Sequence, residues 1–404
     1  MTEPICDFCH ASDKFRCKTR AQAKNCENGP PCPLCGLVDP DHCGSAEDAA
    51  ACPHAPAAPS VTIHGGDCRI ALQRMIAAGQ RVHSVVCDPP YGLKSIIKRF
   101  GKEDAAPALH GTDGLYARQT RGFIGQTWDG TERERDPEFW KLVLDVLLPG
   151  GYCFAFSGSR TGHWQAVAME EAGFIIHPVH GWAYGTGFPK AHDAARAVLK
   201  AGGDPEDVAS WKGWSYGTQA QKPGLEPIYL AQKPMAEKNG GLNMIAHGVG
   251  AVNIDGCRVP ADGDGEDRWP ANVRHDGSDE VRAMFPGAEE ASASRFFHAF
   301  PPEDGVPPLL YNGKAGKEDR AGSDHPTVKP IKLLQYMVRH VTPIGGTVLD
   351  PFAGTGTTAE AARLEGFDCI LMESQPKYLD FLRQRFPQDS DMTDLEAAEI
   401  EALL

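Results

Sequence analysis

The sequence has no apolar run as long as a membrane span, and no charged-then-apolar leader stands at its start. We therefore expect a cytoplasmic protein without a membrane partner. Basic residues are in the minority, because 40 Lys and Arg stand against 54 Asp and Glu and give a formal net charge of −14. A chain of that charge is not coated in nucleic acid, although net charge does not exclude a local contact.

Cysteines are scarce in most of the chain, because eight of the 13 lie before residue 53. The segments 6–26 and 32–52 both read C-x2-C-x7-C-x8-C, so the whole pattern occurs twice. Four thiolates satisfy tetrahedral Zn²⁺, and each C-x2-C turn supplies two of them. The repeat predicts tandem zinc modules over 1–52; free or disulfide-paired cysteines, and ligands shared between the units, are the alternatives. The predicted ligands are Cys6, Cys9, Cys17 and Cys26 for one ion, and Cys32, Cys35, Cys43 and Cys52 for the other.

Strand-like and helix-like spacings alternate along the rest of the chain, which follows a linker at 53–60. An irregular stretch, 236–324, interrupts them and is rich in Gly, Pro, Asp and Arg. Alternation on both sides of such a stretch predicts one doubly wound α/β sheet. Strands are expected at 61–67, 82–88, 152–159, 174–185, 226–234, 346–350 and 367–373, and helices at 68–79, 137–150, up to 172, 331–341, from 357 and 376–386.

The stretch DPFAGTGTT, residues 350–358, follows an apolar strand and precedes a helix. Gly354 and Gly356 let the backbone approach a ligand, and Glu373, at the end of the next strand, can accept both hydroxyls of a ribose. The loop lacks the Lys of a phosphate-binding P-loop and departs from G-x-G-x-x-G. These absences favour a nucleotide-like cofactor without a pyrophosphate.

A second unusual stretch, CDPPYG at 87–92, also follows a strand. Its two prolines fix the backbone and remove two amide donors. The Asp88 carboxylate and the Pro89 carbonyl then offer two acceptors, and Tyr91 offers a flat ring. This arrangement suits an exocyclic amine on a stacked base, since stacking is worth about 1–3 kcal/mol and offsets part of the cost of extruding the base. A tight turn with Tyr91 as a surface cap is the alternative.

Together, DPPYG, HPTVKP at 325–330 and DPFAGTGTT resemble the DNA amino-methyltransferases that modify adenine N6 or cytosine N4. Their order along the chain resembles the β class, whose sheet is circularly permuted. The likeness covers about 61–388 and includes KPGLEPIYLAQKP and RWPANV, which look like a phage- or prophage-associated subset. It implies a Rossmann-like methyltransferase fold that uses S-adenosylmethionine. The implied parts are a catalytic half at 61–235, a target-recognition insert at 236–324, a cofactor half at 325–388 and an acidic tail at 389–404.

The resemblance also implies roles for single residues. The tetrapeptide Asp88, Pro89, Pro90 and Tyr91 would bind a base flipped out of DNA, and the base amine would attack the cofactor methyl directly. The implied cofactor contacts are Asp350, Phe352, Gly354, Gly356 and Thr357 at the methionine part, Thr327 and Lys329 over its carboxylate, Glu373 at the ribose and Asp67 at the adenine. Asp67 also fits a helix N-cap. Gln375 departs from the family, which commonly has an acid at that place.

Two further segments are candidates for DNA contacts. The insert holds nine basic residues against sixteen acids, and the loop 93–128 begins with a locally basic stretch. The loop is therefore the better candidate for phosphate contacts. Four arginines of the insert could read guanines or, equally, be structural; these are Arg258, Arg268, Arg274 and Arg295.

The target base is predicted from the first residue of the tetrapeptide. Asp88 favours adenine N6, because the family members that act on cytosine N4 usually carry Ser there. Cytosine C5 chemistry needs a thiolate, and the only Pro-Cys pair, Pro31–Cys32, belongs to the zinc repeat. The alternatives are N4-cytosine methylation, methylation of RNA or of a protein amide, and an inactive zinc-containing protein that binds nucleic acid. The sequence leaves the oligomeric state open, a homodimer included.

Overall fold

The computed structural model describes residues 59–91, 108–110, 116–118, 133–185, 187, 189–261, 266–287, 292–301, 328–387 and 393–394. The contacts of the chain divide it into two units, Met1–Ala58 and Pro59–Leu404, and the described residues all belong to the second. The eight cysteines of the predicted zinc modules therefore lie outside the described residues. Thr327, most of the loop 93–128 and most of the acidic tail also lie outside them.

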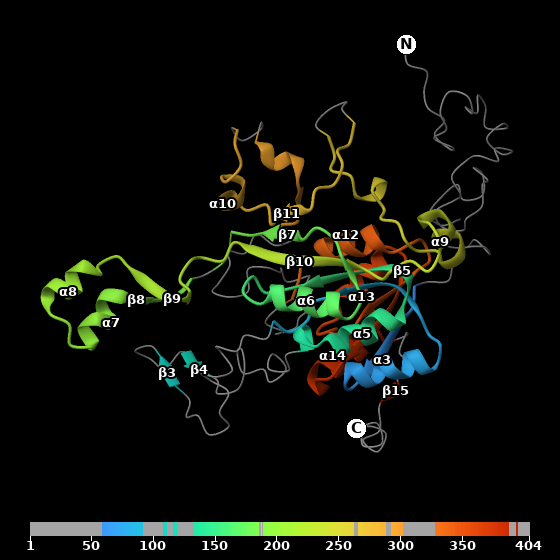
Figure 1. The fold of residues 1–404 in the computed structure, drawn as a ribbon, viewed down its shortest axis with the longest axis horizontal. Coiled ribbons are helices and arrows are strands. Elements are labelled where there is room, and N and C mark those ends of the chain that lie inside the picture. The colour runs from blue at the N-terminus through green and yellow to red at the C-terminus, as the bar shows by residue number, and fades with distance from the viewer. Residues whose placement is uncertain are drawn as a thin grey trace, which may run out of the picture. The chain divides into compact units, whose positions relative to one another are not determined.

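The second unit is built on one large, mostly parallel sheet (Figure 1). It contains a parallel run of six strands, and β10 is antiparallel to both of its main neighbours. In order across the sheet, the strands are β12 (His298–Ala299), β11 (Val273–His275), β7 (His180–Ala183), β10 (Leu225–Gln232), β5 (Leu147–Phe156), β2 (Val82–Cys87), β13 (Thr347–Asp350), β14 (Asp368–Glu373), β1 (Val61–Gly65) and β15 (Thr393–Asp394). A short strand, β6 (Ile175–Ile176), pairs with β10.

Helices cover both faces of this sheet, as near-continuous apolar strands such as Val82–Cys87 require. One core contains the apolar side chains of α3 (Cys68–Ala77), α5 (Pro137–Val146) and α6 (Gly162–Glu171). The other contains those of α12 (Ile331–Val341), α13 (Thr357–Leu364) and α14 (Pro376–Arg385). Residues from both ends of the described chain thus share each core.

The order of the strands brings the two motifs together. β13, which comes late in the chain, lies between β2 and β14, so the loop after Asp350 and the turn after Cys87 leave neighbouring parallel strands. The carboxyl ends of such strands share one edge of a sheet, where ligands of open α/β folds bind. The turn after Cys87 and the loop after Asp350, which are far apart in the sequence, therefore form one site.

Residues 236–301 add short elements that extend the sheet. They include α9 (Gly240–His247), the 3-10 turns Asp255–Cys257 and Ala293–Phe296, and α10 (Asp279–Arg282). Here β11 pairs in parallel with β7, and β12 pairs with β11. A small ladder of β3 (Ala108–His110) and β4 (Tyr116–Arg118) and the 3-10 turn Arg133–Arg135 precede α5.

A separate excursion lies between β7 and β10. It consists of β8 (Lys190–Asp193), α7 (Ala194–Lys200), α8 (Pro205–Ser210) and β9 (Ser215–Gln219), and we call residues 190–219 the arm. β8 and β9 pair only with each other among the described strands, and Figure 1 shows the arm standing clear of the large sheet. No helix in the described part of the chain is long and apolar enough to cross a membrane.

The mixed α/β fold predicted from the alternation is confirmed. One boundary was wrong: α5 ends at Val146 and β5 begins at Leu147, whereas we expected the helix to continue to 150. Pro149 cannot donate to a helical ladder, and the two residues before it join the strand instead. The arm was not predicted, because its helices are short and bury almost no apolar residue.

Candidate active site

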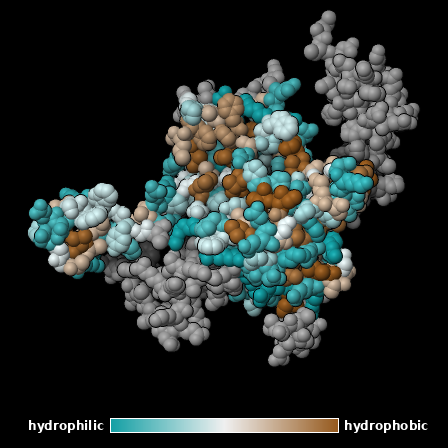
Figure 2. All heavy atoms as spheres, viewed as in Figure 1, coloured by the Kyte–Doolittle hydropathy of each residue, from teal (hydrophilic) through white to brown (hydrophobic). Residues whose placement is uncertain are grey.

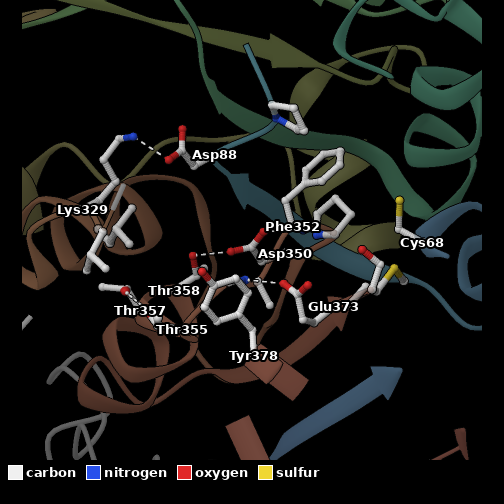
Figure 3. A pocket seen from close by; sticks show the side chains of 18 of the residues that line it. Cys68, Asp88, Lys329, Asp350, Phe352, Thr355, Thr357, Thr358, Glu373 and Tyr378 are labelled. Carbon is white, nitrogen blue, oxygen red and sulfur yellow. Dashed lines mark hydrogen bonds and ion pairs between the residues drawn. The ribbon is translucent and has the colours of Figure 1, made fainter. Parts of the chain in front are cut away.

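A pocket of roughly 800 Å³ of empty space opens at the carboxyl ends of β2, β13 and β14 (Figure 3). Its walls are the loop 350–358, the strand end 372–374, and side chains from three other parts of the fold, namely Asp88, Lys329 and Tyr378. Pro90 and Thr357 also line it. The pocket therefore joins the cofactor loop to the DPPY turn.

The loop 350–358 is held in shape by the carboxylate of Asp350. Its Oδ1 accepts a hydrogen bond from the Phe352 amide at 2.9 Å, and its Oδ2 accepts one from the Thr358 hydroxyl at 2.6 Å. Gly354 and Gly356 have φ of 53° and 77°, which side chains with a Cβ rarely adopt. The loop thus turns tightly at the pocket, which its residues Phe352, Gly354 and Thr355 line.

Glu373 ties the end of β14 to the same loop. Its Oε2 accepts from the Gly354 amide at 2.9 Å and its Oε1 accepts from the Gln375 amide at 2.7 Å. Each carboxylate oxygen has a second lone pair, so both can still accept a ligand hydroxyl. The side chain lies at the pocket wall in Figure 3.

Burial perturbs both of these acids. It raises the pKa of Asp350 to about 7, against the hydrogen bonds from Thr358 and Phe352. It also raises the pKa of Glu373 to about 7, against the amides of Gln375 and Gly354. A ligand that brings positive charge and hydroxyl donors would favour the ionised forms. The residues therefore fit a cationic nucleoside such as S-adenosylmethionine.

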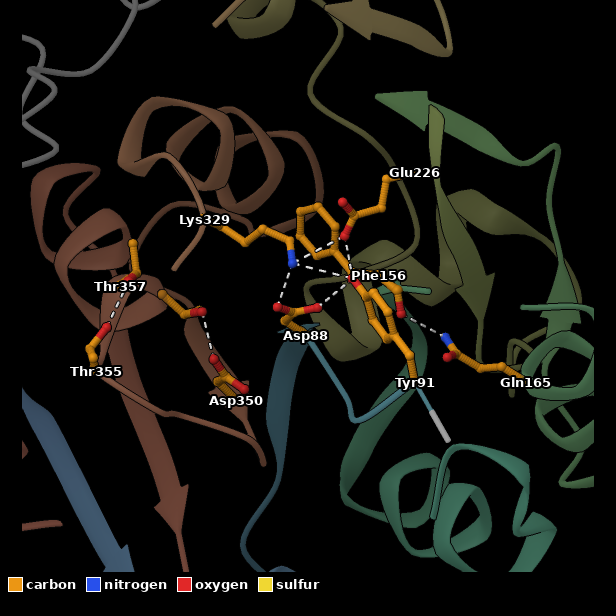
Figure 4. Close-up of polar contacts among 10 residues, drawn as sticks. Asp88, Tyr91, Phe156, Gln165, Glu226, Lys329, Asp350, Thr355 and Thr357 are labelled. Atoms are coloured by element: carbon orange, nitrogen blue, oxygen red, sulfur yellow. Dashed lines mark hydrogen bonds and ion pairs between the residues drawn. The ribbon is translucent and has the colours of Figure 1, made fainter. Parts of the chain in front are cut away.

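The DPPY turn forms a second polar centre beside the first (Figure 4). The Tyr91 hydroxyl donates to Asp88 Oδ1 at 2.8 Å and lies in hydrogen-bond contact with Glu226 Oε1. The Lys329 ammonium lies 2.5 Å from Asp88 Oδ2 and 3.1 Å from Glu226 Oε1. It also lies 4.7 Å from the centre of the Phe156 ring. Two carboxylates, one ammonium and one phenol thus share a buried cluster.

The charged groups of this cluster shift one another's pKa values. Burial raises the pKa of Asp88, and the Lys329 charge opposes the rise. Burial opposes ionisation of Lys329 as well, but the charges of Asp88 and Glu226 outweigh it and raise the pKa of the ammonium. Burial and the two carboxylates raise the pKa of Tyr91. The Lys329 charge is therefore the neighbour that favours the ionised form of Asp88.

Glu226 was missed by the sequence analysis. It is the second residue of β10 and only 3 % exposed, and the stretch LEPIYLAQ shows only a strand pattern. An acid within an apolar strand was the one available signal. A buried carboxylate needs a partner, and its partners, Tyr91 and Lys329, are distant in sequence.

The remaining predicted residues are placed in different ways. Asp67 accepts from the Arg69 amide as the N-cap of α3 and pairs with Arg133 at 2.5 Å, and it is not among the residues that line the pocket. Burial opposes ionisation of Asp67, yet the Arg69 amide and Arg133 lower its pKa. The N-cap alternative therefore describes its contacts. Of the other predicted cofactor residues, Lys329 contacts Asp88. The Phe352 ring packs against the Phe139 ring, with 5.3 Å between the ring centres.

One arginine of the insert does not suit a role in reading DNA. Arg274 is fully buried, its Nη1 lies 2.8 Å from His180 Nδ1, and its guanidinium stacks on the Tyr336 ring. Arg274 is therefore a structural residue and does not read guanine, because a buried side chain cannot reach a base edge. Arg258, Arg268 and Arg295 bond to backbone carbonyls within the insert.

Comparison with known proteins gives the family. A family model described as DNA methylase matches residues 82–384. Type II methyltransferase M.HindIII of Haemophilus influenzae is 26% identical over 298 residues, which cover 70% of this chain and 81% of that protein. M.HinfI of the same species is 35% identical over 94 residues, 22% of this chain and 26% of that protein.

Solved structures are similar at lower identity. The M1.HpyAVI–SAM complex is 15% identical, with a TM-score of 0.41, and covers 80% of this chain and 99% of that one. The cytosine-N4-specific PvuII DNA methyltransferase is 15% identical, with a TM-score of 0.40, and covers 85% and 92%. The family predicted from the motifs is confirmed by the match to residues 82–384: the chain belongs to the DNA methylases of the N6-adenine and N4-cytosine type, which are S-adenosylmethionine-dependent DNA methyltransferases.

Proposed function

We propose that this methyltransferase acts on adenine N6 in DNA, within the cytoplasm. The observation that carries the proposal is Asp88, which stands first in the tetrapeptide and faces the pocket. Resemblance to family members links Asp at this place to adenine and Ser to cytosine N4. Methylation of cytosine N4 is the second candidate, since both amines fit a site with two acceptors.

In this proposal, the Asp88 carboxylate and the Pro89 carbonyl accept the two N–H groups of the flipped base. Hydrogen bonds to these acceptors favour a more tetrahedral nitrogen whose lone pair can attack, and positioning supplies much of the acceleration. Lys329 and Glu226 would hold Asp88 and the Tyr91 hydroxyl in place, which is supported by the contacts of Lys329 with both residues and of Glu226 with Tyr91. Lys329 then serves the target side of the site and not the methionine carboxylate.

S-adenosylmethionine would lie across the loop 350–358 and supply an electrophilic methyl group. Glu373 would accept its ribose hydroxyls, and the backbone of Phe352 and Gly354 would border its methionine part, with Thr357 at the wall. Gly356 would serve through the turn that its φ of 77° allows. Asp350 and Glu373 both accept hydrogen bonds from amides of this loop, which supports the assignment. Asp67, through Arg133, would shape the edge of the pocket, which Arg133 lines.

We further infer that the sheet is circularly permuted. The strand that follows the cofactor loop in sequence, β14, is a direct neighbour of β1, the first strand of the unit. The cofactor half at 325–388 thus completes a sheet that begins at 61. Residues 236–324 would form the target-recognition insert, and the loop 93–128 would contact phosphates.

The two cysteine repeats would each bind one Zn²⁺. The support is the spacing alone, because four cysteines recur in the same order in both segments. Such modules would stand before the methyltransferase unit, which begins near residue 59.

The test of the target base is mass spectrometry of nucleosides from DNA treated with the enzyme and labelled S-adenosylmethionine. We expect label in N6-methyladenine. Label in N4-methylcytosine alone would establish the second candidate and leave the family and mechanism unchanged.

A further inference from the structure

The arm begins and ends next to the polar cluster around Asp88. It leaves the sheet after β7 and returns at β10, and the Tyr184 amide closes its base by donating to the Gly224 carbonyl at 3.0 Å. Two residues later comes Glu226, which contacts Tyr91 and Lys329. Since β10 is antiparallel to β5, its first residues lie at the edge where β2 ends and Asp88 follows.

The surface of the arm is unusually aromatic. Trp211, Trp214 and Tyr216 are 45%, 62% and 51% exposed, and they are half of the large exposed aromatic side chains among the described residues. The Trp211 and Trp214 rings meet edge to face at 5.8 Å. Tyr216 lies 5.4 Å from the ring of His192. A cluster of exposed tryptophans leaves apolar surface in contact with water, which is unfavourable. Such a cluster usually marks a binding surface.

Basic side chains accompany these rings. Lys212 stands between the two tryptophans in sequence, and Arg196 and Lys200 lie one turn apart on α7. All three are exposed, and none forms an ion pair with another described side chain. Of the four acids of the arm, three lie at the start of α8, where Asp204 accepts the amides of Glu206 and Asp207, and the fourth, Asp193, caps α7. Figure 2 shows the arm as a lobe of mixed hydropathy with few strongly apolar atoms.

We propose that the arm is a second DNA-binding element, which contacts the duplex beside the flipped base. A duplex whose base reaches Asp88 must cross the edge from which the arm emerges. A two-stranded ribbon such as β8–β9 fits a DNA groove, the lysine matches the phosphates, and the rings can stack on sugars or unpaired bases. The arm would add affinity for DNA and take no part in methyl transfer itself.

The test uses the full-length protein and two variants, Trp211→Ala/Trp214→Ala and Lys212→Ala. Binding is measured by anisotropy with a fluorescein-labelled duplex of random sequence, and kinetics are measured with unmethylated plasmid DNA and tritiated S-adenosylmethionine. We expect the double variant to raise both the Kd and the KM for DNA by at least about thirtyfold, since stacking is worth about 1–3 kcal/mol per ring and two rings are removed. The kcat and the affinity for S-adenosylmethionine should not change. Lys212→Ala should reduce the slope of log Kd against log salt by about one.

Ile344→Ala is the matched control, because Ile344 is 93% exposed and lies before β13, at the opposite edge of the sheet. The proposal is overturned if the arm variants bind DNA as the wild type does, or if the control loses as much affinity. It is also overturned if the arm variants change only the oligomeric mass in light scattering, which would assign the aromatic surface to a protein contact. The proposal rests on the methyltransferase activity, which the wild-type kinetics test separately from the binding assay.

Discussion

At the scale of single residues, the acids of the pocket form two groups with different contacts and different expected functions. Asp350 and Glu373 hold the loop that follows β13, whereas Asp88 belongs to a cluster with Lys329, Tyr91 and Glu226. Their separation predicts that substitutions can damage target handling and cofactor binding independently.

The first prediction separates these tasks. Asp88→Ala should abolish detectable methyl transfer, at least a hundredfold loss, while the Kd for S-adenosylmethionine changes less than about threefold, because Asp88 faces the target amine. Glu373→Ala should weaken cofactor binding at least tenfold, since hydrogen bonds to a charged group are worth about 1.5–3 kcal/mol. Isothermal titration calorimetry and a methyl-transfer assay measure both. Equal defects in the two variants would refute the division.

The second prediction concerns Lys329. Lys329→Gln removes the cation between Asp88 and Glu226, so Asp88 should ionise only at higher pH and the rising limb of the kcat profile should move to higher pH. Adding Glu226→Gln removes the competing carboxylate and should restore part of the kcat. Cofactor affinity is measured alongside. A variant that keeps its kcat but loses affinity for S-adenosylmethionine would place Lys329 at the methionine carboxylate instead.

The third prediction is a pH dependence of stability. Burial raises the pKa of Glu373 from its usual 4.5 to about 7. Its protonated form therefore stabilises the cofactor-free protein fully below pH about 4.5, and this contribution is lost as pH rises through about 7. Relative to Glu373→Gln, the wild type should lose up to about 3 kcal/mol of unfolding free energy between pH about 5 and about 8.

Urea unfolding without cofactor measures this difference. The exposed Glu171→Gln at the end of α6 is the control and should show no comparable change. A pH-independent difference between wild type and Glu373→Gln would show that Glu373 is already ionised in the free protein.

At the scale of elements, the site depends on a strand that ends in a tight loop. Gly356 caps α13 with φ of 77° and leaves no space behind it, because a Cβ there would lie 2.6 Å from Leu382 Cδ2 and 2.8 Å from Phe386 Cε2. The turn at Gly356 therefore packs directly against Leu382 of α14 and the Phe386 that follows it. This packing connects the last helix of the unit to the cofactor loop.

The fourth prediction follows from that packing. Gly356→Ala should destabilise the protein by about 2–4 kcal/mol, through about 1–2 kcal/mol of left-handed backbone strain and about 1–3 kcal/mol of overpacking. It should also weaken S-adenosylmethionine binding. Gly345→Ala is the matched control, because Gly345 has φ of 69° but nothing within 4 Å of its Cβ position. Thermal unfolding of both variants should show the larger loss for Gly356→Ala; equal losses would contradict the packing argument.

At the scale of the whole molecule, the chain divides near residue 58 into a cysteine-rich unit and the methyltransferase unit. A defect confined to the zinc modules should leave the cofactor pocket intact.

The fifth prediction tests this division. Protein purified in reducing conditions and without chelator should contain about two zinc ions per chain, one for each set of four cysteines. Cys17→Ser should lower the zinc content and destabilise the first module, because a thiolate ligand is lost. The affinity for S-adenosylmethionine should stay as in the wild type. Metal analysis that finds no zinc in the wild type would disprove the modules.

The sequence by itself determined the fold class and the local parts of the site. Apolar runs such as Val82–Cys87 and Asp368–Glu373 predict buried strands, and the residues after them, DPPY and the glycine loop, predict acceptors and a backbone turn. These signals are local, since they depend on periodicity and on residues that are adjacent in the chain. The helix cap at Asp67 was readable in the same way, as one of two alternatives.

Only the tertiary structure decided which residues meet. Asp88 and Lys329 are 241 positions apart, and Glu226 joins them because β10 runs antiparallel beside β5 and starts at the pocket edge. Arg274 became a core residue because β11 pairs with β7, which places its guanidinium against His180 and the Tyr336 ring. The sequence pattern of a strand says which side chains are buried, but its neighbours are set by the order of strands in the sheet, which depends on packing between distant segments.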